Sequence, residues 1–148
     1  MIEAVIFDKD GTLFDFRASW GAWTRSILDA FAKTDAERTH LGQVLGYDPV
    51  ARDFAPDSVV IAMTTHQIAE ILLPHVAPND LAAVNLVMER LAGETPMVPA
   101  VDLRKVLGAL KARGLKLGLA TNDTEAPARK HLAVAGVLDL FDFVAGCD

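Results

Sequence analysis

The length, composition and charge of the chain describe an ordinary folded protein and exclude several functions. It has 148 residues, 51% of them hydrophobic, which is ample material for a buried core. The formal net charge is −6 and the 14 lysines and arginines are scattered, which argues against a nucleic-acid partner because binding to a phosphate backbone needs clustered positive charge. A single cysteine cannot form an internal disulfide, and four histidines without zinc spacing argue against structural zinc.

The sequence also argues against a membrane protein. No apolar run reaches the roughly 20 residues that a bilayer-spanning helix needs. Glu3 and Asp8 place charges where a signal peptide would keep its apolar stretch. We therefore expect a cytoplasmic protein with no membrane partner.

The N-terminus predicts a buried strand that ends in a polar loop. Residues 3–7 (EAVIF) form a short apolar run rich in strand-forming residues, and residues 8–11 (DKDG) follow at once. Because the run is apolar on both faces, we predict a central strand of a parallel sheet. Two further strands are predicted over residues 115–120 and 141–145, each followed by small and polar residues.

Helices are predicted between these strands. Pro99 at the start and Gly114 after the end delimit a helix over residues 100–113, and Gly136 ends a second over residues 125–135. This alternation of strands and helices indicates an α/β fold with a parallel sheet and right-handed crossovers. Ligands of such sheets bind beyond the carboxyl ends of the strands.

A long insertion interrupts this alternation over residues 16–97. It is too long for a connection inside a compact α/β unit and looks wholly helical, so we predict an inserted cap over residues 16–97 and a core formed by residues 1–15 and 98–148. The first two predicted helices of the cap cover residues 18–32 and 36–45, and residues 47–56 are predicted to form a loop. A third helix opens with a capping box at Thr64 and ends at Pro74. The fourth covers residues 79–91 and is closed by Gly93.

The loop after the first strand carries the most informative residues. Asp8 and Asp10 are two residues apart, so one carboxylate can attack phosphorus while the other handles the leaving-group proton. A divalent cation such as Mg²⁺ would offset the repulsion between these carboxylates and an anionic ester. Gly11 provides a permissive turn and lets backbone N–H groups approach a phosphate. We expect the side chain of Lys9 to face solvent.

Residues 8–13 (DKDGTL), at the end of the first strand, resemble the opening signature of the haloacid dehalogenase superfamily. Thr121 and Asn122, after the second strand, resemble that family's second signature, in which a hydroxyl group hydrogen-bonds the transferring phosphoryl group. A helical insertion directly after the first loop is similar to the cap of the phosphoglycolate phosphatase-like branch. The resemblance covers the chain nearly end to end and implies a Rossmann-like core with an inserted helical cap.

The resemblance implies a Mg²⁺-dependent phosphatase and a role for each residue. Asp8 would form an aspartyl-phosphate, and Asp10 would act first as general acid and then as the base that activates water. Mg²⁺ would be bound by Asp8 and by the backbone carbonyl of Asp10. The residues implied to hold the phosphoryl oxygens are Lys9, Gly11, Thr121 and Asn122. The substrate would be a small phosphorylated metabolite, selected by the cap.

Two parts of the family's site have no counterpart in this sequence. Family members carry a lysine and further acidic residues beyond the third strand, whereas Lys130 lies inside a predicted helix and Asp148 ends the chain. We therefore expect a truncated chain with an incomplete sheet, and little or no turnover from these 148 residues alone. The strand over residues 3–7 would then be an exposed apolar edge that invites pairing with a second copy.

Other functions remain open at this point. A phosphomutase of the same architecture would return the phosphoryl group to a sugar, and a catalytically incomplete fragment would serve as an assembly or interaction module. A response-regulator receiver domain also uses an aspartyl-phosphate but does not accommodate a helical insertion after its first strand. We assign no catalytic role to the histidines, His131 among them, and expect Asp15, Asp123 and Asp148 to be caps or turn residues.

Overall fold

A computed structural model describes residues 2–148, which form two compact units. Unit 1 comprises Met1–Ser19 and Pro96–Asp148, and unit 2 comprises Trp20–Thr95. Helix α1 (Phe16–Phe31) begins in unit 1 and continues into unit 2. Over the described residues, no helix has both the length and the apolar character needed to cross a bilayer.

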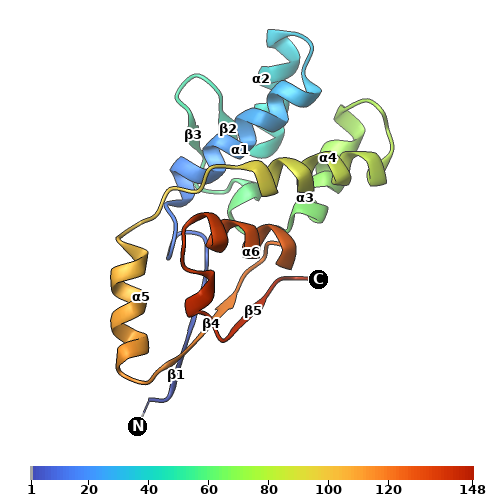
Figure 1. Cartoon of the computed structure of the whole chain (residues 1–148). Coiled ribbons are helices and arrows are strands. Elements are labelled where there is room, and N and C mark those ends of the chain that lie inside the picture. Colours follow the sequence, from blue (N-terminus) through green and yellow to red (C-terminus); the bar gives the residue numbers. More distant parts are fainter. Residues whose placement is uncertain (1) are drawn as a thin grey trace. The chain divides into compact units, whose positions relative to one another are not determined.

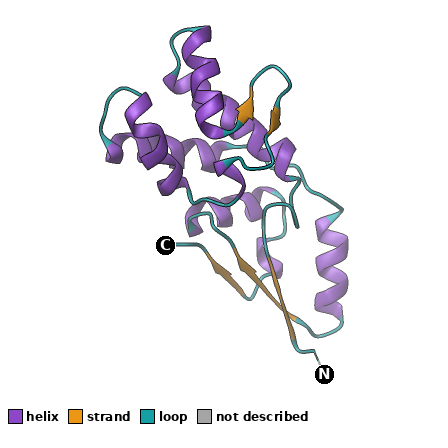
Figure 2. Ribbon diagram, turned by 180° about the vertical axis from the view of Figure 1, so that it is seen from behind, coloured by secondary structure: helices purple, strands orange, loops and turns teal. Residues whose placement is uncertain are grey.

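Unit 1 is built on a three-stranded parallel sheet (Figures 1 and 2). Its strands are β1 (Ala4–Phe7), β4 (Lys116–Ala120) and β5 (Phe143–Ala145), in the order β1-β4-β5. Phe7 pairs with Leu119 in the parallel register between β1 and β4. The predicted α/β class with a parallel sheet is confirmed, and the three strands end at the same edge of the sheet.

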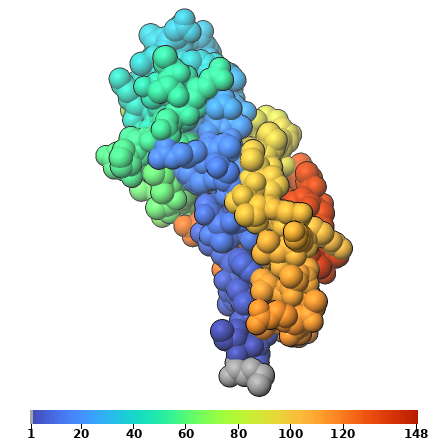
Figure 3. Space-filling view, turned by 90° about the vertical axis from the view of Figure 1, so that its left-hand side faces the viewer, coloured from blue at the N-terminus to red at the C-terminus, as the bar shows by residue number. Residues whose placement is uncertain are grey.

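Helices α5 (Leu103–Ala112) and α6 (Glu125–Val134) supply the apolar side chains that cover one face of this sheet. The space-filling view shows the N-terminal strand lying beside the α5 segment (Figure 3). The 3₁₀ helix η3 (Leu138–Leu140) precedes β5. The buried core contains Leu13, Phe14, Leu103, Leu107, Leu117, Leu119, Ala128, Leu132, Val137 and Val144.

Strand β1 is an edge strand, which confirms the expectation of an exposed edge in this chain and differs from the central position that the apolar pattern alone predicts. Within the described residues β1 pairs only with β4 and therefore lies at an edge of the sheet. Val5 and Phe7 pack against the core, whereas Ile6, on the opposite face, is 62% exposed. A short apolar run does not show whether the same chain provides a neighbouring strand on both sides or covers both faces of the strand. Pairing of this edge with a second copy stays a prediction.

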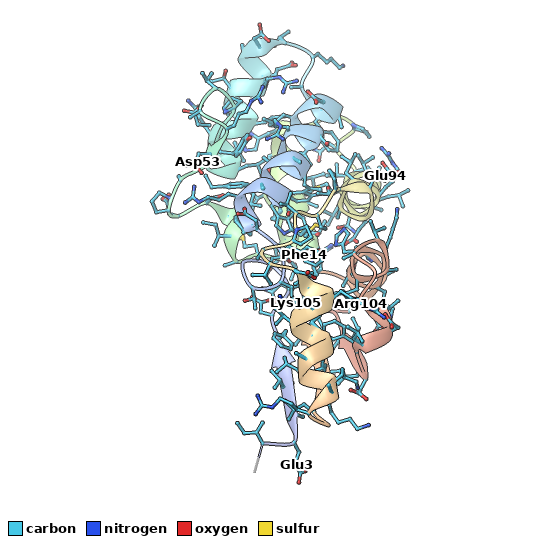
Figure 4. All side chains as sticks on the ribbon, turned by 60° about the vertical axis from the view of Figure 1, so that its left-hand side comes forward. Glu3, Phe14, Asp53, Glu94, Arg104 and Lys105 are labelled. Atoms are coloured by element: carbon cyan, nitrogen blue, oxygen red, sulfur yellow. The ribbon has the colours of Figure 1, made fainter. Side chains whose placement is uncertain are left out.

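Two distant segments of unit 1 pair with each other and shift the start of α5. The N–H of Ala100 donates to the carbonyl of Leu13 at 2.9 Å, and Phe14 forms an antiparallel bridge with Pro99. Because this pairing holds the chain extended, the helix predicted from residue 100 begins only at Leu103. Figure 4 labels Phe14 near the first turn of α5, where Arg104 and Lys105 lie.

Unit 2 is mainly helical. Besides most of α1, it contains the α-helices α2 (Asp35–Leu45), α3 (Thr65–Leu72) and α4 (Leu81–Glu94) and the 3₁₀ helices η1 (Val59–Ile61) and η2 (Leu73–His75). The predicted capping box at Thr64 is confirmed, because its hydroxyl accepts the N–H of Gln67 at 3.3 Å and the Gln67 side chain accepts the N–H of Thr64 at 2.9 Å.

Two details of unit 2 differ from the prediction. The expected loop over residues 47–56 contains a short antiparallel hairpin, β2 (Tyr47–Asp48) with β3 (Asp53–Phe54), in which the Tyr47 and Phe54 rings lie 4.9 Å apart. Helix α4 also continues through Gly93 to Glu94, where the side chain of Thr95 donates to the carbonyl of Leu91 at 2.8 Å. A glycine costs helix stability without necessarily ending the helix.

Candidate active site

The loop that follows β1 is a tight turn closed by its own backbone. The carbonyl of Lys9 accepts the N–H groups of Leu13 and Phe14 at 2.9 and 3.1 Å, and the N–H of Gly11 donates to the carbonyl of Phe14 at 2.8 Å. Gly11 has a φ of +82°, a conformation that glycine adopts without a steric penalty. The loop therefore presents Asp8 and Asp10 on a closed backbone frame.

Asp8 lies directly after β1 and is exposed to solvent. Its Oδ1 accepts the N–H of Lys9 at 2.7 Å, which orients the carboxylate. Asp8 is accessible from solvent, as a group that attacks a soluble ester must be.

Thr121 and Asn122 follow β4, the strand that pairs with β1. Because Phe7 and Leu119 are register partners, Asp8 and Thr121 lie at the carboxyl ends of adjacent parallel strands. The N–H of Thr121 donates to the carbonyl of Ala145 at 3.1 Å, and its Oγ1 accepts the N–H of Asp123 at 3.2 Å. The topology thus brings the two predicted polar loops to one edge of the sheet.

Lys9 is not exposed, and the expectation that its side chain faces solvent is wrong. The residue is 0% exposed, and its Nζ lies 2.8 Å from Oδ1 of Asp10 and 3.0 Å from Oδ2 of Asp123. Nδ1 of His131 lies 3.4 Å from the same Nζ. The cause is strand alternation, which continues from Val5 and Phe7 to place Lys9 on the core side of the sheet.

Asp123 and His131 are thus members of this buried cluster, which sequence reasoning missed. Asp123 is 5% exposed and His131 3% exposed, and Asp123 is more than a turn residue because it faces the Lys9 ammonium. One signal was present in the sequence. A lysine two residues after Phe7 on the core side of a strand must find buried anionic partners, since lysine is almost never fully buried unless it is paired.

The expectations for Asp15 and Asp148 are confirmed. Oδ1 of Asp15 accepts the N–H of Ala18 at 2.8 Å, at the start of α1. Oδ1 of Asp148 accepts the N–H of Glu125 at 2.8 Å, at the start of α6. Both carboxylates satisfy N–H groups that have no partner within their helix, as caps do.

The donor set around Asp8 fits Mg²⁺ as a partial site. In the part of the chain that the structure describes, no three His, Cys, Asp or Glu residues group as they would to hold a metal ion. Mg²⁺ nevertheless commonly uses one or two carboxylates and completes its shell with water and substrate phosphate. Asp8 is exposed and carries hard oxygen donors, whereas the Asp10 carboxylate is paired with Lys9, which leaves the backbone carbonyl of Asp10 as the better donor.

The sequence of residues 2–148 matches the haloacid dehalogenase-like hydrolases, and the chain belongs to this family. Its parallel sheet, with two aspartates after the first strand, agrees with the fold expected from the sequence resemblance.

Individual relatives agree with this family. The chain is 34% identical to a phosphoglycolate phosphatase from Rhodospirillum rubrum over 160 aligned positions, which cover 99% of the chain and 59% of that protein. Among solved structures it is similar to CbbY from Rhodobacter sphaeroides in complex with phosphate, with a TM-score of 0.65 and 18% identity over 99% of the chain and 64% of that structure.

A second similar structure is YfnB from Bacillus subtilis, described as a HAD-hydrolase bound to magnesium. It has a TM-score of 0.58 and 17% identity, over 98% of the chain and 63% of that structure. At these identities the structural likeness concerns the fold. The chain spans less than two thirds of the length of each of these relatives.

Proposed function

We propose that the protein is a Mg²⁺-dependent phosphatase of small phosphomonoesters, with Asp8 as the nucleophile. The observation that carries this proposal is that two loops follow the carboxyl ends of the adjacent parallel strands β1 and β4. One loop presents the exposed Asp8 carboxylate, and the other presents Thr121 at the end of the paired strand. Membership in the haloacid dehalogenase-like hydrolases and the similarity to a phosphoglycolate phosphatase support the same chemistry.

In the proposed reaction, Oδ2 of Asp8 attacks phosphorus, because Oδ1 is engaged by the N–H of Lys9. The bond between phosphorus and the leaving oxygen breaks, and Asp10, which enters this step as the protonated acid, gives that oxygen its proton. Asp10 then removes a proton from water, the resulting hydroxide attacks phosphorus, and the bond to Asp8 breaks to release inorganic phosphate. Thr121 and Asn122 hold the phosphoryl oxygens while charge shifts among them.

Asp8 and the backbone carbonyl of Asp10 are the groups we assign to Mg²⁺. When bound, the ion would supply positive charge that offsets the repulsion between the carboxylates and the anionic ester. We assign unit 1 the catalytic role and unit 2, the inserted helical unit, the selection of the substrate. The name of the Rhodospirillum rubrum relative makes 2-phosphoglycolate the first substrate to test.

The test uses the complete gene product that contains residues 1–148, with Mg²⁺ and a panel of small phosphate esters. Asp8→Asn keeps the shape of the side chain and removes the nucleophile, so we expect kcat to fall by more than about 10³-fold. Asp15→Asn is the matched control, because asparagine caps a helix as well as aspartate does. Unchanged activity in Asp8→Asn would overturn the proposal. Phosphate transfer to a sugar, without release of inorganic phosphate, would instead indicate a phosphomutase.

A further inference from the structure

We propose that Lys9 is a positioning residue that holds the Asp10 carboxylate and ties the Asp8 loop to the Thr121 loop through Asp123. The proposal deepens the function proposed above and depends on it. Its basis is a single buried ammonium that lies 2.8 Å from Oδ1 of Asp10 and 3.0 Å from Oδ2 of Asp123. These two aspartates belong to loops more than 110 residues apart in the chain.

The stability of the fold does not by itself explain why a lysine is buried at position 9. The residue is 0% exposed, and removing an ammonium from water costs several kcal/mol, by general estimates, that its partners must offset. Replacement of a buried ion cluster by apolar side chains of similar volume is often neutral or stabilising. A charged cluster placed between two loops of a candidate active site therefore points to a role in arranging those loops.

Asp123 connects Lys9 to the Thr121 loop. The N–H of Asp123 donates to Oγ1 of Thr121 at 3.2 Å, and the carbonyl of Asp123 accepts the N–H of Cys147 at 2.9 Å. Asp123 is thus held by its backbone on both sides while its carboxylate faces Lys9. Through this chain of contacts, the ammonium sets the Asp10 carboxylate relative to the Thr121 hydroxyl.

The contact with Lys9 also distinguishes the two oxygens of Asp10. Oδ1 faces the ammonium, and the side chain of Asp10 is 17% exposed. Oδ2 is then the oxygen that exchanges a proton with the leaving group and later with water. Loss of Lys9 frees the rotation of this carboxylate, so the expected damage falls on proton transfer.

His131 completes the cluster from helix α6. Its Nδ1 lies 3.4 Å from Nζ of Lys9 and 3.8 Å from Oδ2 of Asp123, and the residue is 3% exposed. Helix α6 thereby contacts both groups of the ion pair that joins the two loops.

The enzymatic test uses the leaving group of the substrate as its readout. An alkyl phosphate such as 2-phosphoglycolate needs a proton on its leaving oxygen, whereas p-nitrophenyl phosphate leaves as a stable phenolate. In the complete gene product with Mg²⁺, we expect Lys9→Met to lower kcat on the alkyl ester by about 10²- to 10³-fold and on p-nitrophenyl phosphate by less than about 10-fold. KM should change little. Lys130→Met, an exposed lysine on α6, is the matched control.

The double variant Lys9→Met/Asp123→Asn keeps the test valid if Lys9→Met does not fold. It removes one buried cation together with one buried anion, and we expect it to fold and to show the same selective loss on the alkyl ester. Equal losses on the two substrates, in an active background, would overturn the positioning role and leave the proposed phosphatase intact. Failure of the unsubstituted protein to hydrolyse either ester would instead overturn the proposed function and this role with it.

Discussion

Lys9→Met should destabilise unit 1 strongly, although methionine is apolar and of similar length. The lysine is 0% exposed, and the side chains of its partners Asp10 and Asp123 are 17% and 3% exposed. Removing one partner of a buried ion pair costs about 3 to 5 kcal/mol, because the remaining charge stays buried without compensation. Domains are typically stable by about 5 to 15 kcal/mol, so this is a large share of the total.

The same reasoning predicts rescue by a second substitution. Lys9→Met/Asp123→Asn removes the buried carboxylate that lost its cation, so most of the lost stability should return. With a urea m-value of about 2 kcal/mol/M, a loss of about 4 kcal/mol lowers the unfolding midpoint by about 2 M. The double variant should recover at least half of that shift.

The assay needs a probe in unit 1, because Trp20 and Trp23 both lie in unit 2 and report its unfolding by fluorescence. Amide hydrogen exchange of a peptide over β4 follows the sheet of unit 1 as urea increases. A loss of less than about 1 kcal/mol in Lys9→Met would refute the reasoning, since that is the range of exposed ion pairs. So would a double variant no more stable than the single one.

Three further predictions concern packing, capping and charge. Leu107→Ala should lower the free energy of unfolding of unit 1 by about 2 to 5 kcal/mol, because Leu107 is 0% exposed in the core. Val106→Ala, on the same helix but 44% exposed, should lower it by less than about 1 kcal/mol. Equal losses of stability in the two variants would contradict this account of the core. Thr64→Ala should lower the free energy of unfolding of unit 2 by about 0.5 to 2 kcal/mol, measured by tryptophan fluorescence, because it removes the N-cap of α3. Thr64→Ser should keep most of that stability. A serine variant as unstable as the alanine variant would contradict the capping role. The hydrogen bond from Lys111, with smaller contributions from a backbone N–H of β4 and a second lysine, lowers the pKa of Asp142 from its ordinary 3.8. Its carboxylate therefore stabilises the fold above pH 3.8, and this contribution is lost as the pH falls toward the folded-state pKa. Urea unfolding should show Asp142→Asn to be less stable than the unsubstituted protein near neutral pH, with a difference that shrinks in acid; a difference independent of pH would rule this out.

Several features were predictable because they depend on residues close together in the chain. The alternation of strands and helices, the glycine stop at Gly114 and the capping box at Thr64 follow from local patterns, and the structure contains each of them. The two polar loops could likewise be expected at one sheet edge, since parallel strands end together. The local pattern failed at the start of α5. Ala100, predicted to begin the helix, instead donates its N–H to the carbonyl of Leu13, and the helix begins at Leu103.

The sequence by itself determined the order of the elements, the parallel sheet and the placement of Asp8 and Asp10 after the first strand, because periodicity and turn residues act over a few positions. Only the tertiary structure decided that the Lys9 side chain is buried and that it meets His131, 122 residues away. The physical reason is that a charged side chain can be buried only where folding brings partners of opposite charge or hydrogen-bonding groups to it. A local sequence pattern cannot identify partners that lie far away in the chain.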